Sequence, residues 1–97
     1  MIAEGASSML LSDKIKLLRS LEGNLRGLNR ELSKSEVGRL IKEELGETIS
    51  QAYLSQLESG KRLHMTAGTR ELLARFFKVH PGYLVSDPEG YNRDIMF

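Results

Sequence analysis

The sequence has 97 residues, which is enough for one small domain with a single hydrophobic core. It contains no cysteine, so disulfides and thiolate metal ligands are excluded, and its two histidines have no acidic neighbours at metal-ligand spacing. With 14 Lys and Arg against 13 Asp and Glu, the net charge is no argument for a nucleic-acid partner. Leucine, glutamate and basic residues are frequent and proline occurs twice, so we expect an all-α fold.

No apolar run is longer than three residues, so no segment is expected to cross a membrane. The first residues lack the basic and then apolar pattern of a signal peptide, and we therefore expect a cytoplasmic protein. We expect residues 1–11 to form a flexible N-terminus, followed by a folded domain over residues 12–87.

The first predicted helix begins at Ser12, where leucines and isoleucine start to recur every three or four residues. Gly23 and Gly27 interrupt this pattern, and each costs about 1 kcal/mol relative to alanine inside a helix. We therefore expect the helix to end near Glu22 and residues 23–31 to form a connector. The alternative is one continuous helix over residues 11–32, whose heptad seam would serve dimerisation.

The second predicted helix has a sharp start. Ser33 and Glu36 have the spacing of a capping box, in which each side chain binds the backbone N–H of the other residue. An apolar face then continues to Leu45, and Gly46 is expected to end the helix.

The third predicted helix covers residues 52–59, with Ser50 as its N-cap and Gly60 after its end. Its expected buried positions are Tyr53, Leu54 and Leu57.

The fourth predicted helix opens at Thr66 or at Thr69. A short fifth helix is expected to start at His80 and Pro81, and residues 88–97 form a tail with a possible dimer contact. The inner face of the fourth helix is expected to consist of Leu72, Leu73, Phe76 and Phe77.

Two short capped helices joined by a tight connector form a unit that can dock on DNA, with the second helix offering its first turn to base edges. The outer face of residues 50–59 is polar and carries no acid. Gln51 can hydrogen-bond adenine and Ala52 can touch a thymine methyl group, while small serines allow close approach to phosphate. A polar solvated face is the plain alternative. Glutamine and serine in place of the usual Glu and Lys favour DNA, as do Lys61 and Arg62 directly after the helix.

The string Tyr-Leu-Ser-Gln-Leu-Glu-Ser-Gly-Lys-Arg at residues 53–62 resembles the signature of the phage-repressor/XRE family of helix-turn-helix regulators. The likeness extends over residues 13–87 and includes Gly38, at a position where the family packs two helices closely. It implies a lambda-repressor-like five-helix DNA-binding domain. It also implies that Glu58 is structural and holds the loop behind it.

Residue by residue, the resemblance places base contacts at Gln51, Ala52 and Gln56. Phosphate contacts are expected at the start of the second helix, along the third helix and in the loop after it. These positions are Ser33, Lys34, Ser35, Ser50, Tyr53, Ser55, Ser59, Lys61 and Arg62. For Tyr53 two roles stay open, a core position and a phosphate contact through its hydroxyl.

The chain departs from the family pattern in two connections. Residues 42–48 make the passage from the second to the third helix longer than usual, and residues 23–31 lengthen the first connection. Both features resemble a subgroup of actinobacterial secretion-locus regulators with an extended second helix. The added glutamates would repel phosphate, so we expect them to point away from the duplex.

We therefore expect a sequence-specific regulator of double-stranded DNA, acting as a homodimeric repressor, because one recognition helix contacts few base pairs. The dimer surface is either the tail or the leucine-rich start of the chain. The alternative is a protein-interaction module, such as an antitoxin or an accessory factor. Neither His64 nor His80 has a carboxylate partner in sight for a catalytic triad, so we expect no enzyme. We also expect no metal, no cofactor and no small-molecule ligand, since a sensing domain does not fit in this length.

Overall fold

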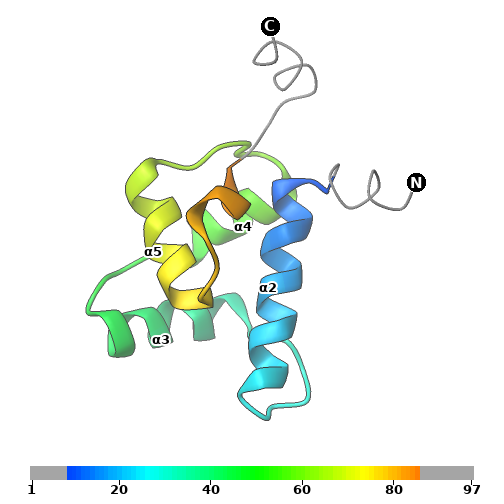
Figure 1. Cartoon of the computed structure of the whole chain (residues 1–97), viewed down its shortest axis with the longest axis vertical. Helices are drawn as coiled ribbons and strands as arrows, with labels where there is room; N and C mark the ends of the chain where they lie inside the picture. Colours follow the sequence, from blue (N-terminus) through cyan, green and yellow to red (C-terminus); the bar gives the residue numbers. More distant parts are fainter. Residues whose placement is uncertain (1–8, 86–97) are drawn as a thin grey trace, which may run out of the picture.

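The computed structural model describes residues 9–85, which form helices and no strands, so the expected all-α class is confirmed for this part of the chain. The expected tail and the first eight residues of the expected flexible N-terminus lie outside the described residues. With the labels of Figure 1, the elements are α2 (Leu11–Leu25), α3 (Lys34–Leu45), α4 (Gln51–Ser59), α5 (Ala67–Phe77) and the 3₁₀ turn η1 (Pro81–Leu84).

The first helix differs from both expectations. α2 starts at Leu11, whose side chain is buried, and continues through Gly23 to Leu25. The predicted end near Glu22 was therefore wrong. The alternative of one helix over residues 11–32 was also wrong, because Gly27 and Asn29 adopt positive φ angles of 80° and 59° that turn the chain.

Gly23 lies inside α2 because the following connector crosses directly over it. A Cβ atom at this position would lie 1.8 Å from the carbonyl oxygen of Arg30. The connector is held there by hydrogen bonds from the N–H of Leu28 to the Gly23 carbonyl and from the N–H of Leu32 to the Arg19 carbonyl. This close approach outweighs the poor helix propensity of glycine.

Replacing Gly23 by alanine should therefore destabilise the protein by about 1–3 kcal/mol, because backbone would have to move to admit the methyl group. Gly68→Ala in α5 is the matched control. Its added Cβ meets nothing within 4 Å, so it should stabilise by about 0.5–1 kcal/mol. Urea unfolding of both variants measures the two effects, and an equal change in both would contradict the crossing.

The starts and ends of the later helices follow their predicted caps. Ser33 and Glu36 form the capping box, with the Ser33 hydroxyl accepting from the Glu36 N–H at 3.0 Å. Gly46 and Gly60 end α3 and α4 in the left-handed conformation. Thr66, not Thr69, is the N-cap of α5. The last predicted helix is a single 3₁₀ turn of four residues.

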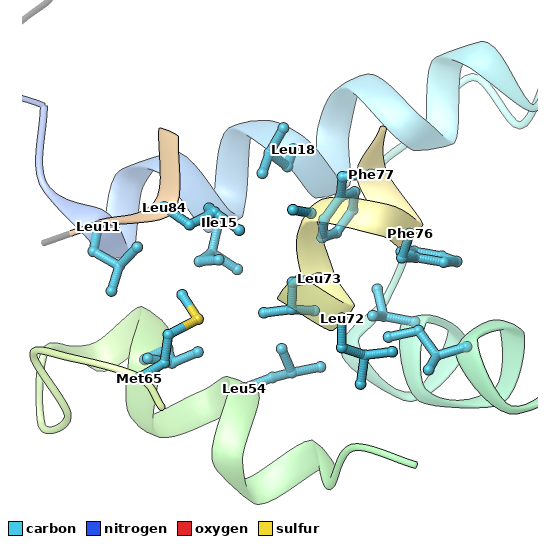
Figure 2. Close-up of a cluster of buried hydrophobic side chains, with 14 of the residues drawn as sticks. Leu11, Ile15, Leu18, Leu54, Met65, Leu72, Leu73, Phe76, Phe77 and Leu84 are labelled. Atoms are coloured by element: carbon cyan, nitrogen blue, oxygen red, sulfur yellow. The ribbon is translucent and has the colours of Figure 1, made fainter. Parts of the chain in front are cut away.

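The core lies where α2, α4 and α5 meet, as Figure 2 shows. α4 packs along α2 and also against α3, while η1 folds back on α5. Phe76 and Phe77 are buried, with their rings 5.0 Å apart in an edge-to-face arrangement, which confirms their predicted place in the core. The side chains buried to 2% exposure or less are Ile15, Leu32, Val37, Ile41, Leu54, Leu57, Leu73, Ala74, Phe76 and Leu84.

A buried ion pair joins α2 to the end of α4. The Arg19 guanidinium donates from Nε and Nη2 to the two carboxylate oxygens of Glu58, at 2.6 and 2.7 Å, and from Nη1 to the carbonyl of Leu32 at 2.6 Å. Arg19 is 6% exposed and Glu58 is 7% exposed. Glu58 is thus buried and structural, but its partners lie on α2 and not in the loop behind it. The pair holds α2, α4 and the approach to α3 in one arrangement.

Arg19→Met should destabilise the protein by about 3–5 kcal/mol, because it leaves the Glu58 carboxylate buried without a counter-charge. The double variant Arg19→Met/Glu58→Leu should recover much of this loss, since no unpaired charge remains. Thermal and urea unfolding of the single and double variants test this, and simple additivity of the two substitutions would contradict it.

Candidate nucleic-acid interface

The first turn of α4 presents two open side chains. Ser50 caps the helix by accepting a hydrogen bond from the Tyr53 N–H at 3.0 Å, which satisfies one donor of the first turn. Gln51 and Ala52 follow and are both exposed, and the Gln51 amide makes no hydrogen bond within residues 9–85. An amide and a methyl group are therefore free to meet a ligand here.

The start of α3 lies next to the middle of α4. The Lys34 ammonium is 3.4 Å from the Ser55 hydroxyl, although the two residues are 21 positions apart in the sequence. Ser33 and Ser35 lie at the same end of α3, with their hydroxyl oxygens 3.2 Å apart. Four of the predicted phosphate-contacting residues are thus brought together on one surface by the packing of α3 on α4.

The end of α4 and the turn after it are tied together locally. The Ser59 hydroxyl donates to the carbonyl of Gln56 and accepts from the N–H of Lys61. The side chain of Lys61 is exposed and makes no ion pair within residues 9–85. It is therefore available to an anion at this end of the helix.

The structure places Tyr53 where its predicted phosphate contact cannot form. Its hydroxyl oxygen is buried and has no hydrogen-bond partner among the described residues. A phosphate in solvent cannot reach a buried hydroxyl, so this expectation is corrected. The Arg62 guanidinium lies over the Tyr53 ring, with its Cζ 4.6 Å from the ring centroid.

Sequence reasoning missed the contacts that Arg30 and Arg62 make within the chain. Arg62 donates from Nε to the side-chain oxygen of Gln56 at 3.1 Å. Arg30 forms two hydrogen bonds of 2.8 Å with the Glu36 carboxylate, beside the start of α3. Both pairs span six residues across a turn, a separation at which the helical spacing rules give no signal.

The Glu36 carboxylate would repel a phosphate at the start of α3 if it were unpaired. The Arg30 guanidinium, and after it the backbone N–H of Ser33, lower the pKa of Glu36 from its ordinary 4.5 to about 2. The charge of this carboxylate is thus compensated by its neighbours while it serves the cap of α3.

Glu36→Gln should remove a contribution to stability that depends on pH. Because the folded state lowers the pKa, this contribution is complete above about pH 4.5 and is lost as the pH falls toward 2. Glutamine keeps the capping geometry but loses the charge. Urea unfolding should therefore show a gap between wild type and variant at pH 7 that closes in acid. A gap of equal size at every pH would contradict this assignment.

Within residues 9–85, no three His, Cys, Asp or Glu side chains are grouped so that they could hold a metal ion. Over the same range, none of the helices has the length and apolar character needed to cross a membrane. Comparison with protein-family models, with curated proteins and with solved structures finds no match to this chain. The candidate interface is therefore defined by the geometry of the described residues alone.

Proposed function

We propose that this protein is a sequence-specific regulator that binds double-stranded DNA, with α4 in the major groove and the start of α3 on the phosphate backbone. The observation that carries the proposal is the single surface formed by the first turn of α4 and the start of α3. On this surface the side chains of Gln51 and Ala52 are exposed, and the Lys34 ammonium is 3.4 Å from the Ser55 hydroxyl. The one acid of α4, Glu58, is buried and lies away from this surface. Uncharged polar groups beside cations suit base edges flanked by phosphates.

The family and the finer fold belong to the same proposal. The string at residues 53–62 resembles the XRE signature, and the order of four helices and a terminal 3₁₀ turn is compatible with a lambda-repressor-like domain whose fifth helix is reduced to one turn. Gln51, Ala52 and Gln56 are the proposed base contacts, and all three are exposed.

The acidic residues of α3 support this orientation. Glu44 accepts two hydrogen bonds from Arg26, at 2.9 and 3.0 Å, and Glu43 lies 3.3 Å from Arg39. Two of the extra glutamates, Glu43 and Glu44, are therefore paired with cations of this chain, which reduces their repulsion of a phosphate backbone.

We further propose that the protein acts as a homodimer and as a repressor. A single recognition helix contacts too few base pairs for specificity in a genome, and two helices related by a dyad overcome this.

A second candidate function is binding of another protein, and one observation favours it. The outer side of α2 and the turn after it expose leucines that the core does not use, and Leu25 is 80% exposed. Such an apolar stripe on a small chain is typical of an interaction surface. Its members are Leu17, Leu21, Leu25 and Leu28.

Gln51→Ala and Lys61→Ala should separate the two kinds of DNA contact. Selection of bound fragments from random duplex DNA gives the preferred site, on which fluorescence anisotropy measures affinity. Gln51→Ala should cost about 1–3 kcal/mol on that site and relax the preference for one base. Lys61→Ala should weaken binding to all sequences alike and reduce the salt dependence by about one unit.

An unchanged site preference in Gln51→Ala would show that the first turn of α4 does not contact base edges. If wild-type protein enriched no sequence, and modest salt abolished its binding, then only non-specific phosphate attraction would remain. That outcome would favour the protein-binding function.

A further inference from the structure

The turn after α4 brings Arg62 back onto the exposed face of the helix. Gly60 ends α4 with a φ of 83°, and two residues later the Arg62 N–H donates to the carbonyl of Gln56 at 3.0 Å. The Arg62 side chain then donates from Nε to Oε1 of Gln56 and covers the ring of Tyr53. One backbone contact and two contacts of the guanidinium thus hold Arg62 against α4.

These contacts determine which end of the Gln56 amide faces outward. A guanidinium has only donors, so the Gln56 atom that faces it must be the carbonyl oxygen. The amide NH₂ lies at the other end of the group and points away from Nε. Beside it, the two terminal nitrogens of Arg62 make no hydrogen bond within residues 9–85. Gln56 and Arg62 therefore present the amide NH₂ and the terminal guanidinium nitrogens as donors, while the amide oxygen accepts from Arg62.

From this geometry, and on the basis of the proposed function, we infer that Gln56 and Arg62 act together as a pair of donors that selects guanine. Arg62 orients the Gln56 amide and supplies a terminal N–H as the second donor. A free glutamine binds adenine in bidentate fashion, accepting from N6 and donating to N7. Gln56 keeps its donor for N7, while its oxygen already accepts from Arg62, so N6 of adenine would have to compete with the guanidinium for it. Guanine presents two acceptors, O6 and N7, which match this pair of donors.

The Tyr53 ring contributes to this selection by holding the guanidinium in place. Contact between a guanidinium and an aromatic face limits the freedom of a long side chain on an exposed turn. Arg62 is thus distinguished from Lys61, its neighbour in the same turn, whose ammonium makes no hydrogen bond to Gln56.

Selection from random duplex DNA with wild type, Gln56→Ala, Arg62→Met and Lys61→Ala tests the inference. Gln56→Ala identifies the base position that this residue contacts, where wild type should prefer guanine over adenine by about tenfold or more. Arg62→Met and Lys61→Ala each remove one positive charge from the turn. The first should reduce the guanine preference about tenfold or shift it to adenine, and the second should leave it unchanged.

The free protein offers a readout without DNA. The side-chain amide signals of Gln56 in an NMR spectrum should move in Arg62→Met and stay in place in Lys61→Ala. If the Gln56 side-chain amide signals kept their positions in both variants, the inference would be overturned. It would also be overturned by selection of adenine at the Gln56 position in wild type, or by equal losses in Arg62→Met and Lys61→Ala with unchanged base preference. Absence of any enriched sequence, with the NMR shift present, would instead overturn the proposed DNA function.

Discussion

The rest of the structure depends on the ion pair between Arg19 and Glu58. Both groups are removed from water, so each needs the other, and Nη1 of the guanidinium also donates to the carbonyl of Leu32. Three segments therefore meet at one guanidinium: the middle of α2, the end of α4 and the residue before the cap of α3. Apolar packing alone would allow α4 to rotate on α2, whereas a pair with defined geometry permits one orientation.

That orientation has a direct consequence for the candidate interface. Since Glu58 is buried on the same side of α4 as Leu54 and Leu57, the opposite side is left to Ala52 and Gln56. The acids of α3 are paired with arginines from three different parts of the chain. The near-neutral total charge therefore conceals a separation, within residues 9–85, between paired carboxylates and unpaired cations. The surface formed by α4 and the start of α3 carries cations, and the carboxylates of α3 form ion pairs with arginines.

The features that sequence analysis predicted are those that local chemistry decides. Caps such as Ser33 and Ser50 act within three residues, and the glycines that end α3 and α4 act within one turn, so their positions followed from the sequence alone. Gly23 lies inside a helix, where its low propensity predicted an end, because the connector crosses directly over it in space. Arg19 and Glu58 are 39 residues apart in the sequence, so no local pattern indicates that they form an ion pair.

The same distinction applies to the candidate site. Which residues of α4 face outward could be predicted from helical spacing. The hydrogen bond from Arg62 to Gln56 could not, because it depends on the path of the turn after Gly60, and the burial of the Tyr53 hydroxyl could not, because it depends on tertiary packing. The lysine of α3 that reaches Ser55 likewise depends on how two helices pack.

The most direct test of the central claim is an NMR titration of ¹⁵N-labelled protein with a selected duplex and with a scrambled duplex. If α4 and the start of α3 form the DNA surface, the selected duplex should shift the backbone amides of Gln51, Ala52 and residues 33–35 more than those of the rest of the chain. The scrambled duplex should affect mainly the phosphate-facing cations. Shifts centred on the outer leucines of α2, or identical patterns with both duplexes, would contradict the account.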